Sequence, residues 1–423
     1  MERSPMSSPA RIAVVGGGIG GLTLALELRA AGVECRIFEA VPELSAVGVG
    51  INLLPHATRQ LDRLGLLGEL SAAAVTTRES VFFNRFGQHI YTEPVGTSGG
   101  YQWPQLSIHR GDLQAVLADA VRARLGDGAL VTGHRCTGVD QDDSGVTLRL
   151  ARPDGTTSEH RADGVVACDG IHSAVRRQLH PGEGAPVYSG YNMWRGVAAW
   201  DPILSGASMI RVGWLATGKL VIYPIRDNVD GTGRQLVNWV VEIETPRHAD
   251  RDWTRAGRID DFIDRFAGWH FDWLDVPALI RASDTVLEYP MEDQDPLDWW
   301  GTGRVTLLGD AAHPMVPRGS NGGGQAVLDA TALAAALRED IPVTEAFAAY
   351  EARRRPATTA VVRANRTNPP DAILREVYQR TGDRPFGQIE DVISVAELEE
   401  IIASYKRTAG YSLSTLNVQS AEA

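Results

Sequence analysis

The chain has 423 residues, a formal net charge of −12 at pH 7, 43% hydrophobic and 22% charged residues. This composition is typical of a globular protein with roughly two or three domains. The acidic balance argues against binding along a nucleic-acid backbone, and no apolar run approaches the ~18 residues of a membrane-spanning helix. The N-terminus lacks the apolar core of a signal peptide, and the three cysteines form no CxxC pair. We therefore expect a cytoplasmic protein without a nucleic-acid or membrane partner, whose first residues form a tail.

The first expected element is a strand over residues 11–15, followed by a glycine turn and a helix that ends near Gly32. The turn reads GGGIGG at 16–21, and a second strand over 33–38 leads to Glu39. In such a unit Gly16 permits the tight turn, Gly18 admits a pyrophosphate and Gly21 allows close helix–strand packing. The helix N-terminus attracts phosphates, and Glu39 would accept hydrogen bonds from a ribose. The pattern predicts dinucleotide binding without distinguishing NAD from FAD.

The remaining elements suggest two domains that are interleaved in sequence. The expected elements are a loop and helix over 48–70, strands over 78–92, a helix from Arg110, a β-hairpin over 131–167, aromatic-rich strands over 187–245, a strand at 304–309 and helices from 326 onward. The fold class is then α/β: a Rossmann-like domain, a β-sheet substrate domain and a helical C-terminus. We assign 1–78, 106–185 and 291–370 to the first, 79–105 and 186–290 to the second, and 371–423 to the C-terminal segment with its polar tail.

Two further motifs follow apolar strands. The strand DGVVAC ends at Asp169-Gly170, and the strand RVTLLG ends at Gly309-Asp310, before AAHPMVPRGSNGGGQAVLDA. With the glycine turn, these resemble the three fingerprints of single-component (class A) FAD-dependent aromatic monooxygenases, which have the p-hydroxybenzoate hydroxylase fold. The segments GVGIN, SIHRGDLQ, MWRGV, YPI and LVNWV are most similar to the phenazine-hydroxylase branch, which includes 5-methylphenazine-1-carboxylate 1-monooxygenase.

The resemblance implies a resident FAD, with NADH or NADPH and O₂ as cosubstrates, and hydroxylation of an aromatic ring through a flavin C4a-hydroperoxide. It also implies that Arg110 touches the flavin cofactor, that Asp169 serves both FAD and the nicotinamide nucleotide, and that Asp310 binds ribityl or ribose oxygens. Independently of the family, the four glycines within residues 319–324, among them Gly322, let the backbone pass close to a flat ring. A helix over 326–338 would then direct its positive end at that ring.

The substrate is expected to be an aromatic or heteroaromatic small molecule in a dry cavity. The aromatic side chains proposed to line it are Trp194, Tyr223, Trp239 and Tyr289, each of which could equally belong to the sheet core. Arg195 could bind a substrate carboxylate bidentately or be a paired surface arginine. No catalytic residue is assigned.

Several other classes of protein fit less well. A disulfide reductase needs a redox cysteine pair, a flavin-dependent halogenase needs an early lysine whereas the first here is Lys219, and the histidines form no metal-ligand cluster. Epoxidation, Baeyer–Villiger insertion or FAD binding without turnover stay open, as does the choice between monomer and homodimer.

Overall fold

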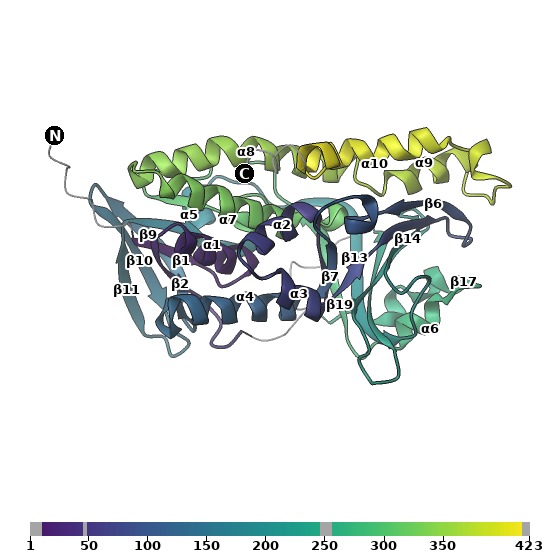
Figure 1. The fold of residues 1–423 in the computed structure, drawn as a ribbon, viewed down its shortest axis with the longest axis horizontal. Helices are drawn as coiled ribbons and strands as arrows, with labels where there is room; N and C mark the ends of the chain where they lie inside the picture. Colours follow the sequence, from purple (N-terminus) through teal and green to yellow (C-terminus); the bar gives the residue numbers. More distant parts are fainter. Residues whose placement is uncertain (1–10, 45–48, 246–255, 417–423) are drawn as a thin grey trace.

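The computed structural model describes residues 11–44, 49–245 and 256–416. The expected N-terminal tail and the last seven residues of the polar tail lie outside this range. Figure 1 shows two β-sheet regions at opposite ends of the long axis, with helices α8, α9 and α10 lying along one side of both.

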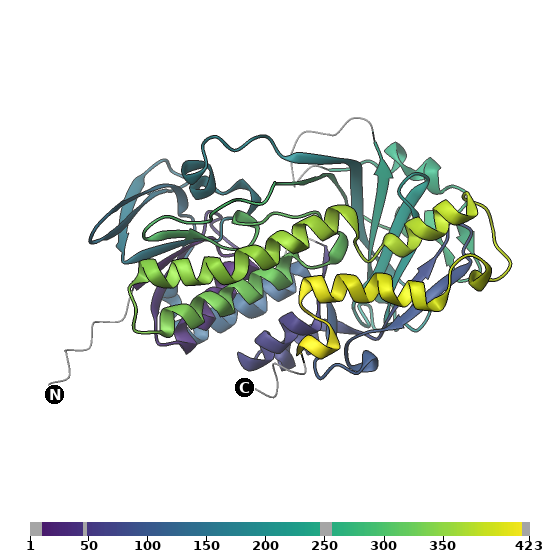
Figure 2. The same cartoon turned by 90° about the horizontal axis from the view of Figure 1, so that it is seen from above.

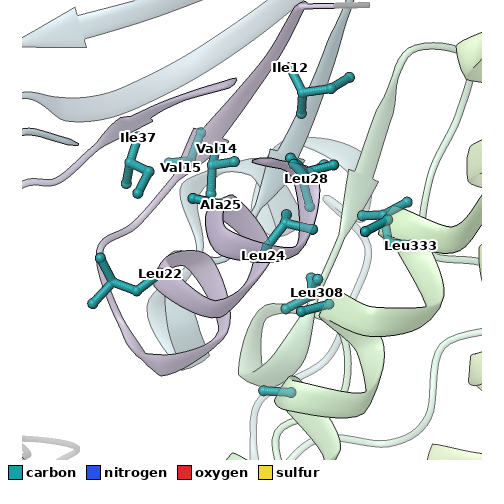
Figure 3. Close-up of a cluster of buried hydrophobic side chains, with 14 of the residues drawn as sticks. Ile12, Val14, Val15, Leu22, Leu24, Ala25, Leu28, Ile37, Leu308 and Leu333 are labelled. Atoms are coloured by element: carbon teal, nitrogen blue, oxygen red, sulfur yellow. The ribbon is translucent and has the colours of Figure 1, made fainter. Parts of the chain in front are cut away.

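The first region is built on a five-stranded parallel sheet in the order β20-β12-β1-β2-β8. Strands β1, β12 and β20 are buried on both faces apart from Arg11, as expected for a parallel sheet covered by helices. Figure 3 shows Val14 and Ile12 of the central strand packing toward Leu24 and Leu28 of helix α1, with Leu308 and Leu333 beside them. The elements are β1 (Arg11–Val15), α1 (Ile19–Ala30), β2 (Glu34–Phe38), β8 (Leu130–Val131), β12 (Gly164–Ala167) and β20 (Val305–Leu307).

The expected hairpin over 131–167 divides between two sheets. Its first strands form the antiparallel sheet β9-β10-β11, whereas its end is β12 of the parallel sheet. Complete burial of β12 explains the difference, because the run GVVA has no polar face that could remain in an exposed hairpin. The bounds are β9 (Arg135–Asp142), β10 (Gly145–Ala151) and β11 (Thr157–Ala162), followed by helix α5 (Ala174–Leu179).

The second region is a seven-stranded sheet in the order β19-β13-β16-β15-β14-β5-β6, antiparallel apart from the β14–β5 pair. One face packs on the segment around Phe262 and on helix α6, and the other faces the first region and the C-terminal helices. Its elements are β5 (Glu79–Phe83), β6 (His89–Pro94), β13 (Val187–Trp200), β14 (Ser208–Trp214), β15 (Gly218–Arg226), β16 (Gln235–Glu244), β17 (His270–Phe271), β18 (Leu274–Asp275), α6 (Val276–Arg281) and β19 (Val286–Asp293), with β17 and β18 forming a separate pair.

A small sheet in the order β3-β7-β4 connects the two regions. Residues 50–53, expected as loop, form β3 because they pair with β7 along their whole length. The elements are β3 (Gly50–Leu53), α2 (Pro55–Arg63), α3 (Leu67–Ala73), β4 (Ala74–Thr77), β7 (Gln105–His109) and α4 (Arg110–Leu125).

The chain ends in a helical layer, as Figure 2 shows from above. Helix α7 begins at Gly322, four residues before the expected start at 326. The bounds are α7 (Gly322–Arg338), α8 (Val343–Thr367), α9 (Ala372–Thr381) and α10 (Val395–Ala409).

Candidate functional site

In the glycine segment at the start of α1, a side chain would clash with the backbone at two of the glycines and would meet open space at a third. Gly16 has φ +101°, and a Cβ on it would lie 2.5 Å from the carbonyl oxygen of Cys168. A Cβ on Gly21 would overlap the carbonyl oxygen of Gly16. A Cβ on Gly18 would meet nothing within 4 Å, and no side chain caps α1 at this point. The free N–H groups of α1 therefore face open space, as a pyrophosphate site requires.

Glu39 lies beside this turn. Its carboxylate accepts hydrogen bonds from the backbone N–H of Gly17 at 2.6 Å and of Val41 at 2.9 Å. On the other side, Gln114 donates from Nε2 to the carbonyl oxygen of Gly17 at 2.8 Å. The sequence analysis did not single out Gln114, although it ends the quoted segment SIHRGDLQ.

Asp169 follows strand β12 and is half-buried. Its Oδ2 accepts a hydrogen bond from the N–H of Ala174 at 2.9 Å, whereas Oδ1 is buried with no hydrogen-bond partner among the described residues. Burial raises the pKa of Asp169, opposed by hydrogen bonds from Ser173 and Ala174. An acceptor oxygen buried without a donor fits a site completed by a bound group.

Asp310, in contrast, is exposed at the end of β20 and stands at the start of helix α7. A Cβ on Gly322 would lie 3.7 Å from its Oδ1. Helix α7 starts with three glycines and has no side-chain cap, so its first N–H groups and positive dipole end lie open beside this carboxylate.

Two sets of buried side chains hold these segments in place, and sequence analysis singled out neither. Arg176 of α5 donates to the carbonyl oxygens of Ala311 and Ala312, both at 2.9 Å, which joins the segment after Asp169 to the one after Asp310. Asp329 of α7 binds His313 and Arg354 at 2.6 Å each. The residues bound by Arg176 lie more than 100 positions away in the sequence, and those bound by Asp329 lie about 20 positions away, so no local sequence pattern predicts either set.

Arg195, Tyr223 and Tyr289 come together on the sheet face that looks toward the first region. Arg195 Nη2 and the Tyr223 hydroxyl both donate to the carbonyl oxygen of Gly50, at 2.7 and 3.0 Å. Burial lowers the pKa of Arg195, while Tyr223 and Tyr289 act to raise it and Arg110 acts to lower it. The exposed Arg110, at the start of α4, is thus near enough to interact with this group.

Trp194 and Trp239 lie on the opposite face of the same sheet. Their rings pack on Phe262 at centroid distances of 5.1 and 6.0 Å, and Trp239 donates to Ser283 Oγ at 2.7 Å. Successive strand residues point to opposite faces, so Trp194 and Arg195 cannot line one cavity. The geometry places the two tryptophans in the sheet core, the alternative that the sequence left open.

A pocket that is partly open to solvent lies between the seven-stranded sheet and α10. Its lining includes Gly319 and Ser320, in the loop that leads into α7. Its charged lining residues are Arg211, Lys406 and Glu93, of which the last two form an ion pair. The other residues that line it are Leu54, Pro55, Ser80, Phe82, Val95, Gly96, Tyr101, Gln105, Met209, Pro370, Ile402 and Tyr411.

Buried charges lie directly behind Arg211. Asp371 pairs with Arg211 at 3.0 Å and with Lys219, and Lys219 also donates to Glu242 at 2.8 Å. Arg318, in the loop before α7, approaches Glu242 at 3.5 Å. Three cations thus face two carboxylates, and this excess of positive charge beside the pocket favours an anionic ligand.

The residues present fit an FAD molecule. The open space at Gly18, the Glu39 carboxylate beside the glycine turn, and the uncapped α7 beside Asp310 suit its phosphates, ribose and ring respectively. Within the described ranges, no group of three or more His, Cys, Asp or Glu side chains could hold a metal ion. Nor is any helix in this part of the chain long and apolar enough to cross a membrane.

Comparisons with known proteins agree with this geometry. The chain is 40% identical over 401 residues to phenazine 1,6-dicarboxylic acid hydroxylase of Lysobacter antibioticus, covering 93% of this chain and 96% of the relative. It is 36% identical over 407 residues to 3-amino-4-hydroxybenzoate 2-monooxygenase of Streptomyces cremeus, covering 95% and 96%. Among solved structures, Klebsiella pneumoniae HpxO with FAD and uric acid matches with a TM-score of 0.75 and 25% identity, over 96% of this chain and 97% of that one. The FAD binding domain family matches residues 10–365, and the chain therefore belongs to this family of flavoproteins.

Proposed function

We propose that this protein is an FAD-dependent monooxygenase that uses NADH or NADPH and O₂ to hydroxylate an aromatic or heteroaromatic acid. The observation that carries the proposal is the position of the pocket, whose lining includes the same loop, Gly319–Ser320, that leads into the uncapped helix α7. A ring bound there would lie next to the group held by that helix. In this proposal residues 79–105 and 186–290 contribute the substrate side.

The bound flavin would supply hydride acceptance and oxygen activation, and the chain's residues would supply position and environment. The N-terminus of α7 stabilises negative charge on a ring placed at its end. The Gly50 carbonyl is fixed by Arg195 and Tyr223, which sets the small sheet against the seven-stranded one. The apolar side chains in the lining of the pocket, such as Phe82, Met209 and Ile402, would limit the access of water to the reacting ring.

Positively charged side chains in the pocket support a substrate that carries a carboxylate. Arg211 lines the pocket, with its guanidinium 5.3 Å from the Phe82 ring centroid, and Lys406 lies on the facing helix. An arginine beside an aromatic ring suits a planar carboxylate-bearing ligand, because the guanidinium can bind both carboxylate oxygens. The relatives named above act on a phenazine dicarboxylic acid and an amino-hydroxybenzoate, which agrees with this class.

The test is a screen of the purified holoenzyme with aromatic acids and their neutral amides, phenazine-1-carboxylate and phenazine-1-carboxamide among them. We expect an acid to stimulate NAD(P)H oxidation and to gain one oxygen atom by mass spectrometry, while its amide reacts more slowly. Stimulation without oxygen incorporation would contradict hydroxylation and favour a flavoprotein that only reduces oxygen. Ring expansion or an epoxide product would assign one of the alternative reactions.

A further inference from the structure

A buried tyrosine of the C-terminal helix α10 contacts the loop that leads into α7. The Tyr405 hydroxyl donates to Asn365 Oδ1 at 2.6 Å and accepts from Asn321 Nδ2 at 3.1 Å. Asn365 in turn donates to the carbonyl oxygen of Val316 at 3.0 Å. A Cβ on Gly319 would overlap the Tyr405 hydroxyl oxygen, so the loop backbone passes directly against it. Both ends of the loop over 316–321 are therefore fixed through one hydroxyl group.

The hydrogen bonds continue from this loop into α7. Gln325 donates from Nε2 to the carbonyl oxygen of Ala409 at 3.2 Å and accepts from Arg354 at 2.7 Å. Arg354 also binds Asp329, which accepts from the N–H of Gly309 at 3.2 Å. Each of these side chains is buried, so every missing bond would leave an unsatisfied polar group in the interior. The network links the end of α10 to both segments that face the flavin position.

The same helix forms a wall of the substrate pocket. Ile402 and Lys406 of α10 line it, as does Tyr411 just beyond the helix, while Tyr405 points into the loop instead. Figure 2 shows α10 on the outside of the molecule beside α9, with its last turns next to the end of α8. Helix α10 thus contacts the pocket with one face and the loop over 316–321 with the other.

We propose that Tyr405 is a positioning residue, which holds the loop over 316–321 in register with the flavin and makes the C-terminal helix part of the active site. The proposal extends the proposed function, but it requires only FAD binding and not turnover. The hydroxyl stays protonated, since burial raises the pKa of Tyr405, and it acts as a fixed donor and acceptor.

The experiment compares Tyr405→Phe with Tyr350→Phe. Tyr350 is equally buried, and its hydroxyl donates to the carbonyl oxygen of Leu307 at 3.2 Å, outside the loop over 316–321. Tyr405→Phe leaves two buried partners without their hydrogen bond and Tyr350→Phe leaves one, so both variants should lose stability in urea unfolding, Tyr405→Phe more than Tyr350→Phe. Only Tyr405→Phe should weaken FAD binding, by at least threefold in a fluorescence titration, and shift the visible spectrum of the bound flavin.

Two further measurements test whether Tyr405 acts on FAD binding through the loop over 316–321. Amide hydrogen exchange of the holoenzyme should rise at residues 316–322 in Tyr405→Phe and not in Tyr350→Phe. Asn321→Ala should reproduce the change in FAD affinity, and the double variant should add less than the sum of the two, because the residues share one hydrogen bond. Unchanged exchange, spectrum and FAD affinity in Tyr405→Phe would overturn the proposal, whether or not the screen finds a hydroxylated product. Equal effects in both tyrosine variants would overturn it as well, since they would reflect general loss of packing.

Discussion

Gly18 and Gly21 lie three residues apart in the same turn, yet the structure predicts opposite outcomes for the same Gly→Ala change. Gly18 has φ −78° and ψ −176°, which any residue adopts, and a Cβ there meets nothing within 4 Å. The apoprotein of Gly18→Ala should therefore be as stable as the parent or up to about 1 kcal/mol more stable, because alanine restricts the unfolded chain. In Gly21→Ala the new Cβ overlaps the Gly16 carbonyl and pushes α1 away from β1, a change that costs about 1–3 kcal/mol.

Gly18→Ala should weaken FAD binding although it does not lower the stability of the apoprotein. The methyl group of Gly18→Ala occupies the space in front of the α1 N-terminus, so we expect FAD to bind at least tenfold more weakly, about 1.4 kcal/mol. Urea unfolding of the apoproteins and fluorescence titration with FAD measure the two quantities separately. Gly68→Ala is the matched control, since its Cβ also meets nothing within 4 Å but lies in α3, and it should leave FAD affinity unchanged. If Gly18→Ala bound FAD as tightly as the parent, the pyrophosphate would not approach this backbone and the reasoning would fail.

The remaining predictions concern cofactor, substrate and acid stability. Asp310→Ala and Glu39→Ala should each lower FAD affinity at least tenfold in equilibrium dialysis, and retention of full FAD on purification would contradict their ligand roles. Arg211→Gln should raise the KM for an aromatic acid about tenfold while changing that for its amide little; a parallel rise for both would place the acid group elsewhere. Burial lowers the pKa of His56 to about 3, so acid favours the unfolded state and stability falls as the pH drops below about 6.5. His56→Leu should remove about 2 kcal/mol of the stability lost between pH 7.5 and pH 5, as urea unfolding of the parent and the variant at both values would show.

Local sequence was enough to predict an FAD-binding protein because each feature of the expected cofactor site is a short pattern. Glycines at 16, 18 and 21 and carboxylates at strand ends are visible within a few residues, and the parallel sheet brings such strand ends to one edge. The pocket has no comparable signature. Arg211 lies in an aromatic strand that shows nothing special, and its surroundings come from positions as distant as Leu54 and Tyr411. The expected domain bounds stay a prediction, as do the roles of the candidate site residues.

The aromatic candidates show a second limit of sequence reasoning. Alternation along β13 assigns Trp194 and Arg195 to different faces of the sheet but does not say which face looks toward the cofactor. That choice depends on what covers the sheet, and Phe262 and helix α6 cover the tryptophan face. Large aromatic side chains are as suitable for such a core as for a ligand cavity, so their number in the sequence did not decide between the two.

The start of helix α7 shows why propensity gave the wrong boundary. Glycine is about 1 kcal/mol less favourable than alanine within a helix, so three in succession predict a start after Gly324. In the structure these glycines form the first turn, and a Cβ on each would meet a different neighbour. Gly322 lies toward Asp310, Gly323 toward Ile51 at 3.0 Å, and Gly324 toward His56 at 3.2 Å. The Cβ positions of this turn therefore face other side chains, and this tertiary packing offsets the unfavourable propensity. A helix N-terminus without side chains is the arrangement that lets a flat ring approach its N–H groups, so the residues that mislead a local prediction are those that the site requires.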